Sequence, residues 1–79
     1  MQMLRLPEVL ARSGYSRTAL YRRMAAGLFP KQVFISDHAV AWPDIEVDKV
    51  LSFILHAPTE EELRLFVRSL EEERHASRS

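Results

Sequence analysis

The two glycines of this chain, Gly14 and Gly27, do most to restrict how it can fold. Glycine easily adopts the left-handed backbone conformation in which many helices end. Gly14 therefore predicts the end of a short helix over residues 7–13, and Pro7 suits its first turn because N–H groups there have no partner within the helix. Gly27 predicts the end of a second helix over residues 16–26. We expect two short helices joined by a tight turn.

The second predicted helix has one apolar side and one polar side. Ser16 stands at its N-cap, where a serine hydroxyl accepts a hydrogen bond from a free backbone N–H group. Successive residues are about 100° apart around a helix, so Leu20 and Met24 lie close together and are expected to face the core. Thr18 and Arg22 point in nearly the opposite direction. The pattern predicts a helix that is held by its apolar side and exposes its polar side.

A small β-hairpin is predicted after the two helices. Its alternating apolar residues are Val33, Ile35, Val40 and Trp42, and its turn consists of Ser36, Asp37 and His38. We expect the four apolar side chains to share one face. Because a two-stranded hairpin is not stable by itself, that face should pack on the helices. Trp42 is accordingly expected in the core.

Two more helices are expected beyond the hairpin. Pro43 suits the first turn of a third helix, whose apolar residues follow helical spacing at Val47, Val50, Leu51 and Ile54. Pro58 interrupts this helix. Thr59 and Glu62 then form the pattern of a capping box, which predicts a fourth helix with an apolar stripe of Leu63, Phe66, Val67 and Leu70. Beyond Glu71 the chain is charged or polar, so we expect its last residues to fray.

Length and composition exclude several functional classes. With 79 residues the chain has room for one hydrophobic core and hence for one domain. No cysteine is present and the histidines are far apart in sequence, so neither a metal nor another cofactor is expected. No nucleophile and base have a recognisable spacing, so we expect neither an enzyme nor a small-molecule substrate. Because no apolar segment could span a bilayer or direct secretion, the protein is expected in the cytoplasm.

The formal net charge is zero, but the charges are distributed unevenly. Residues 1–40 contain six Lys and Arg and two Asp and Glu, which gives +4, whereas residues 41–79 contain five and nine, which gives −4. An arginine-rich helix face is often only a solvated surface. Here the glycine turn, the serine cap and the inward apolar residues agree with one another. We therefore favour a second interpretation, in which the first half binds a polyanion.

Two short helices joined by a glycine turn are typical of the helix-turn-helix, whose second helix enters the major groove of DNA. The residues predicted to contact base edges are Arg17, Thr18 and Arg22. Arginine can donate two hydrogen bonds to guanine O6 and N7, and threonine can hydrogen-bond to a base or contact a thymine methyl group. The residues predicted to contact phosphate are Ser16, Tyr21, Arg23 and Lys31. Double-stranded DNA is therefore the predicted partner.

Three segments of the chain resemble a known family. They are "SRTALYRR" (residues 16–23), "GLFPK" (27–31) and "AVAWPDIEVDKVL" (39–51). Together they resemble the AlpA-type prophage regulators, small winged-helix DNA-binding proteins that are related to phage excisionases and, more remotely, to the N-terminal domain of MerR. The resemblance covers about residues 3–55.

The resemblance implies a recognition helix over residues 16–26 and a wing around residues 36–38. It also implies a role in transcriptional control or in the directionality of site-specific recombination, in which excisionases bend DNA and contact an integrase without performing chemistry. Wings in this family usually carry a glycine and a basic residue near the tip, whereas this chain has Asp37 and His38. His38 is the predicted phosphate contact of this wing, which we expect to bind DNA weakly unless the histidine is protonated.

The expected fold is mainly α with a small β-hairpin: a winged helix-turn-helix over residues 1–57, a C-terminal helix over residues 58–75 and a frayed tail over residues 76–79. The C-terminal helix, which many family members lack, is expected to cover the third helix, where Phe53 and Leu55 fall outside the apolar stripe. Alternatively, it forms the interface of a homodimer or binds another protein.

Two functions remain open at this point. The first is a sequence-specific DNA-binding protein that acts as a transcriptional regulator or excisionase of a prophage or mobile element, alone or as a cooperative oligomer on DNA. The second is a protein-interaction module, such as an anti-repressor or integrase accessory protein, which binds DNA weakly and uses the acidic half and the fourth helix. The turn, the cap and the phase of the second helix favour the first.

Overall fold

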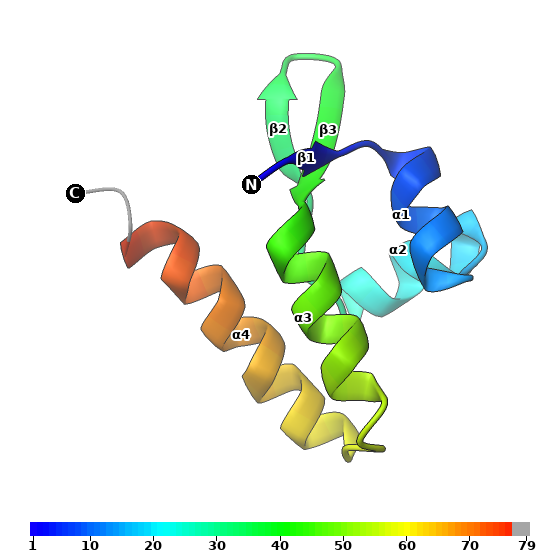
Figure 1. Ribbon diagram of the computed structural model, residues 1–79, viewed down its shortest axis with the longest axis vertical. Coiled ribbons are helices and arrows are strands. Elements are labelled where there is room, and N and C mark those ends of the chain that lie inside the picture. The colour runs from blue at the N-terminus through cyan, green and yellow to red at the C-terminus, as the bar shows by residue number, and fades with distance from the viewer. Residues whose placement is uncertain (77–79) are drawn as a thin grey trace.

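The computed structural model describes residues 1–76, which form four helices and a three-stranded antiparallel sheet (Figure 1). In chain order the elements are β1 (Met3–Leu4), α1 (Leu6–Ser13), α2 (Arg17–Ala25), β2 (Val33–Ser36), β3 (Ala39–Pro43), α3 (Asp44–Ile54) and α4 (Glu60–Ala76). The fold is mainly α with a small β-hairpin, a winged helix-turn-helix followed by a C-terminal helix, as predicted. Residues 77–79 of the expected tail lie outside the described residues.

The helix-turn-helix forms where the two glycines predict it. α1 ends at Gly14, whose φ of 78° is left-handed, and Gly27, with a φ of 77°, follows the end of α2. The hydroxyl of Ser16 accepts a hydrogen bond from the backbone N–H of Ala19 at 3.1 Å, so Ser16 caps α2 as predicted. Short-range signals therefore determine where the second helix begins and ends.

The sheet has the strand order β1-β3-β2, with β3 in the centre. β1 pairs with the end of β3, where Met3 lies opposite Pro43 and Leu4 lies opposite Trp42. The sequence does not predict this strand, because two residues are too few to show an alternating pattern. β1 connects the start of the chain to the base of the hairpin and places Leu4 in the core.

The hairpin of β2 and β3 differs from the prediction in which side chains share a face. Ser36 is the last residue of β2 and lies opposite Ala39, a register that by itself would place Ile35 opposite Val40. An irregularity between Phe34 and Ser36 shifts the register by one residue, so Phe34 lies opposite Val40 instead. Because neighbouring residues of a strand point to opposite faces, the shift exchanges the two faces of β2. The predicted common face of Val33, Ile35, Val40 and Trp42 is therefore wrong.

The hydrophobic core draws on every helix and on two of the strands. Its buried residues are Leu4, Val9, Leu20, Met24, Leu28, Phe29, Trp42, Val47, Val50, Leu63, Val67 and Leu70. Leu20, Met24 and Trp42 are thus in the core, as predicted. The indole N–H of Trp42 donates a hydrogen bond to the carbonyl of Pro30 at 2.9 Å, so the one polar atom of this side chain is satisfied there.

α4 lies along α3 and contributes three side chains to the core (Figure 1). The predicted capping box is present at its start: the backbone N–H of Thr59 donates to the Glu62 carboxylate at 2.8 Å, and the N–H of Glu62 donates to the Thr59 hydroxyl at 3.1 Å. Near the end of α3, the rings of Phe53 and Phe66 stack with centroids 4.3 Å apart. Of the two residues that the prediction leaves outside the stripe of α3, Phe53 is thus covered within the chain, whereas Leu55 is 85% exposed.

The C-terminal helix ends close to its predicted bound at residue 75. α4 continues to Ala76, which the prediction assigned to the tail. Glu71 and Arg74 hydrogen-bond to the backbone of Lys31, just before β2. These contacts with a distant segment order the end of α4, and no local pattern indicates them.

Candidate nucleic-acid interface

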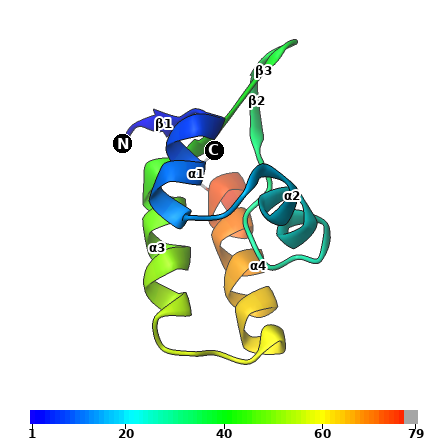
Figure 2. The same cartoon turned by 90° about the vertical axis from the view of Figure 1, so that its right-hand side faces the viewer.

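The interface is built on α2, which has a buried side and an exposed side. Leu20 and Met24 are 0% and 4% exposed and fix the helix in the core. Arg17, Thr18 and Arg22, the predicted base contacts, are all exposed. In Figure 2, α2 and the hairpin both lie toward the right-hand side, with the hairpin above α2. A rigid basic helix is thus presented beside a β-hairpin.

Arg17 and Tyr21 form a pair in the first turns of α2. The guanidinium carbon of Arg17 lies 6.0 Å from the centre of the Tyr21 ring, within the range of a cation–π contact. Residues four apart on a helix are neighbours, and Tyr21 is half-buried. The ring therefore supports the arginine side chain and leaves its donors on the surface.

Arg23 is positioned differently from the other two arginines of α2. Its side chain is half-buried, and its guanidinium carbon lies 5.0 Å from the centre of the Tyr15 ring. Tyr15 in turn contacts Phe29 edge to face, with centroids 6.3 Å apart. Within residues 1–76, Arg23 Nε is buried without a hydrogen-bond partner. Arg23 thus also packs against the turn between the two helices, and its phosphate contact stays a prediction.

Ser16 is exposed, but its hydroxyl is already engaged in capping α2. We expect replacement of Ser16 by alanine to lower the free energy of unfolding by about 0.5 to 2 kcal/mol, since a free N–H loses its partner. Urea denaturation followed by circular dichroism measures this loss. Ser52→Ala, at an exposed position inside α3, is the matched control and should change stability little. Equal effects of the two substitutions would show that the cap contributes nothing.

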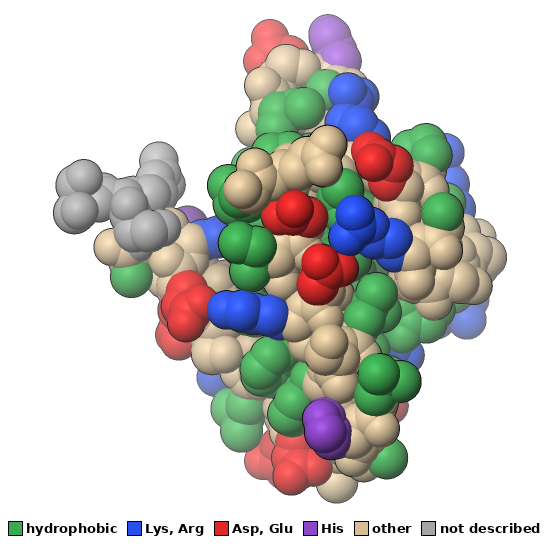
Figure 3. Space-filling view, viewed as in Figure 1, with side chains coloured by type: hydrophobic (Ala, Val, Ile, Leu, Met, Phe, Trp, Pro, Cys, Tyr) green, Lys and Arg blue, Asp and Glu red, His purple; other side chains and the backbone are tan. Residues whose placement is uncertain are grey.

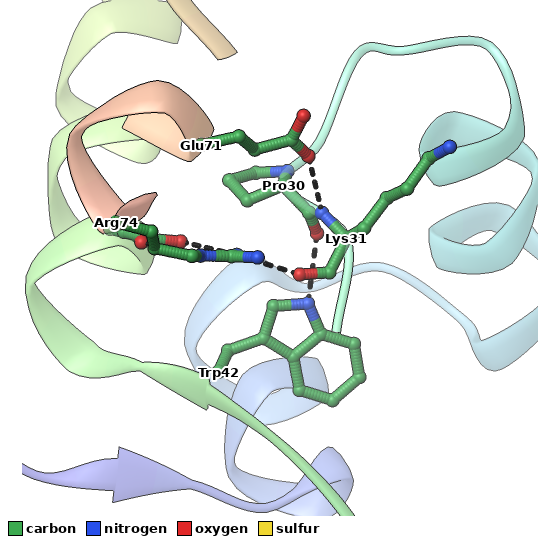
Figure 4. Close-up of polar contacts among 6 residues, drawn as sticks. Pro30, Lys31, Trp42, Glu71 and Arg74 are labelled. Carbon is green, nitrogen blue, oxygen red and sulfur yellow. Dashed lines mark hydrogen bonds and ion pairs between the residues drawn. The ribbon is translucent and has the colours of Figure 1, made fainter. Parts of the chain in front are cut away.

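Lys31 and His38 extend the interface away from α2. Lys31 is exposed, and Figure 4 shows its side chain pointing away from α4 and toward α2. His38 and Asp37 are the exposed residues of the hairpin turn, at the far end of the wing. Lys31 thus points toward α2, whereas His38 lies at the turn of the hairpin. Whether either contacts phosphate stays a prediction.

Acidic side chains are absent from α2 and gather on another element of the fold. Arg12 is paired with Asp48 at 2.9 Å, so this arginine connects α1 to α3. α2 contains no acidic residue, whereas Glu60, Glu61 and Glu62 are exposed together at the start of α4. Figure 3 shows acidic side chains gathered at that lower end of the molecule. The acidic cluster thus lies on a different element from the basic helix.

Two further kinds of feature, a cluster of metal-binding side chains and a membrane-spanning helix, are not found in residues 1–76. No group of three or more histidine, aspartate or glutamate side chains in this range could hold a metal ion. None of the helices there combines the length and the apolar character that crossing a membrane requires.

The α4 residues that contact the segment before β2 are the part of the site that sequence reasoning misses. Arg64, Glu71 and Arg74 each hydrogen-bond to the backbone of that segment. In the sequence they resemble ordinary exposed charges of an amphipathic helix, about 40 residues from their partners. No signal in the sequence alone indicates these pairings.

A helix-turn-helix with a neighbouring hairpin and a basic, exposed second helix defines the chain as a winged helix-turn-helix protein of the DNA-binding type. The family model described as prophage CP4-57 regulatory protein (AlpA) matches residues 2–53. The chain belongs to this family of prophage regulatory proteins, as the three sequence segments suggested. The match includes α1, α2, the hairpin and most of α3, and α4 lies beyond it. Comparison with curated proteins and with solved structures gave no match.

Proposed function

We propose that this protein is a sequence-specific DNA-binding regulator that inserts α2 into the major groove. One observation carries the proposal: Thr18 and Arg22 are exposed opposite the buried side of α2, and Arg17 is exposed in its first turn. A helix with this arrangement can present arginine donors to guanine without first ordering its backbone. Membership of a prophage regulatory family supports the same function.

Within this proposal the exposed residues have different tasks. Arg17, Thr18 and Arg22 contact base edges and thereby select the sequence. The proposed phosphate contacts, which orient the helix on the duplex, are Ser16, Tyr21, Arg23, Lys31 and His38. Ser16 contributes mainly by capping, because its hydroxyl already accepts a hydrogen bond in the free protein.

We further propose that the protein acts by binding and without catalysis, as a transcriptional regulator or an excisionase of a prophage. In the second case an integrase is its protein partner. Because a single short helix recognises few base pairs, we propose that two or more copies bind neighbouring sites. This role requires access to the chromosome and therefore a cytoplasmic location.

The decisive experiment is selection of bound oligonucleotides from a random pool, followed by gel-shift titration of the enriched sequence. Enrichment of one motif supports the proposal, and recovery of unrelated sequences contradicts it. With about four to six phosphate contacts, the logarithm of the binding constant should fall with the logarithm of salt concentration with a slope of roughly −4 to −5. A slope near zero would contradict phosphate binding by this surface.

The alternative function, a protein-interaction module, depends on the apolar stripe of α4. Leu63, Val67 and Leu70 of that stripe are buried in the chain's own core. Removal of residues 59–79 would therefore unfold the domain as well as remove an interface, and it does not separate the two functions. The occupied stripe favours DNA binding as the main activity.

A further inference from the structure

The segment between α2 and β2 connects the recognition helix to the wing, and α4 supplies much of its support. Outside regular helices and strands, backbone N–H and carbonyl groups need other partners. In this segment, side chains of α4 bind the carbonyl of Ala26 and both the N–H and the carbonyl of Lys31. α4 thus contacts the connection at both of its ends.

The first contact lies at the end of the recognition helix. Arg64 Nε donates a hydrogen bond to the carbonyl of Ala26, the C-cap residue of α2, at 2.8 Å. Two carbons of the same side chain come within 3.6 and 3.8 Å of the point where a Cβ on Gly27 would stand. Glu60, one turn earlier, lies 3.4 Å from the Arg64 guanidinium. Arg64 is therefore held against the last turn of α2.

The second contact lies at the start of the wing (Figure 4). The Glu71 carboxylate accepts a hydrogen bond from the N–H of Lys31 at 2.9 Å, and Arg74 donates to the carbonyl of Lys31 at 2.7 Å. Arg74 is itself fixed by two hydrogen bonds to Glu46 on α3, at 2.6 and 2.8 Å. Both side chains of this ion pair are largely buried, with 20% and 9% exposed. α4 thus binds both the N–H and the carbonyl of Lys31.

We propose that α4 sets the position of the recognition helix relative to the wing, with Arg64, Glu71 and Arg74 as positioning residues for DNA binding. This inference rests on the function proposed above. A helix and a wing that contact DNA together lose affinity if the connection between them must be ordered on binding. α4 lies beyond residues 2–53, the part of the chain that matches the family model. The helix-turn-helix and the wing of the matched part are therefore supported by a helix outside it.

Glu71 allows a test in which electrostatics and positioning predict opposite results. Removal of a negative charge should strengthen binding to a polyanion, yet Glu71→Ala also removes the acceptor for the Lys31 N–H. We expect Glu71→Ala to bind the selected DNA sequence about 3- to 10-fold more weakly than the unaltered protein. Glu71→Gln should bind at least as tightly as the unaltered protein, because its amide oxygen can accept the same hydrogen bond.

Glu72→Ala is the matched control, since Glu72 is the exposed neighbour of Glu71 and its removal changes the charge equally. Gel-shift titration on the selected sequence and on unrelated DNA, at a temperature where all variants are folded by circular dichroism, gives affinity and specificity together. We expect Glu71→Ala to bind the selected sequence more weakly than Glu72→Ala does. The two variants should bind unrelated DNA with equal affinity. Equal specific affinities of Glu71→Ala and Glu72→Ala would overturn the inference.

Arg64 provides an independent comparison if Glu71→Ala does not fold. Arg64→Ala removes the hydrogen bond to Ala26, whereas Arg68→Ala removes the same charge from an exposed position one turn further along α4. We expect a loss of specific binding, about 3- to 10-fold, only for Arg64→Ala. Equal losses for Arg64→Ala and Arg68→Ala would overturn the positioning role of α4 and leave the proposed DNA-binding function standing. Absence of specific binding by the unaltered protein would overturn the proposed function, and this inference with it.

Discussion

Replacement of Arg22 by alanine is expected to cost about 1 to 3 kcal/mol of binding free energy on the selected DNA sequence and to relax specificity at one base pair. Arg22 is exposed on α2, opposite the side that is fixed by Leu20 and Met24. Its guanidinium can donate two hydrogen bonds to one guanine, so its loss should be concentrated at that position. Gel-shift titration against a set of single-base variants of the site measures both effects.

The matched control for this prediction is Arg68→Ala, which removes an exposed arginine from α4. Both variants lose one positive charge, so a general loss of attraction to DNA should be shared by the two. A base-pair preference that disappears only in Arg22→Ala identifies a base contact. If Arg22→Ala weakens binding to every sequence by the same factor, Arg22 contacts only phosphate and the proposed role in recognition is wrong.

The helix-turn-helix was predictable because its determinants are local. Gly14 ends one helix, Ser16 caps the next, and the spacing of Leu20 and Met24 determines which side is buried. Each of these signals acts within one or two turns of helix and needs no knowledge of the rest of the chain. The exposed position of Arg22 follows from the same spacing.

The hairpin faces could not be predicted, because one irregularity reverses them. The alternation of apolar residues indicates strands, but it does not show that the register shifts between Phe34 and Ser36. One inserted residue moves a whole strand's side chains to the opposite face. Phe34 is 70% exposed and Ile35 is 47% exposed, so both faces of β2 present apolar side chains to solvent in a wing that is also poor in positive charge.

The support of the interface by α4 was also beyond prediction, for a different reason. Arg64, Glu71 and Arg74 contact backbone atoms of residues 26 and 31, and a backbone carbonyl has no residue identity that a sequence pattern could match. Such contacts depend on how α4 lies along α3. The sequence therefore indicates which helix exposes a basic side and gives little information on what holds that helix in place.

Replacement of Leu20 by alanine is expected to lower the free energy of unfolding by about 2 to 5 kcal/mol. Leu20 is fully buried, and it is one of the two side chains that anchor α2. In a domain of this size, that loss should lower the thermal midpoint by about 8 °C or more. Thermal denaturation followed by circular dichroism measures the shift.

Leu65→Ala is the control for Leu20→Ala, because it makes the same chemical change on α4 at a side chain that is 56% exposed. Its effect on the free energy of unfolding should stay within about 0.5 kcal/mol. At a temperature where Leu20→Ala is still folded, its DNA affinity should fall less than that of Arg22→Ala, since the substituted side chain faces the core. Unchanged stability of Leu20→Ala would mean that α2 is not anchored by this residue, and the exposed position of Arg22 would then lose its structural basis.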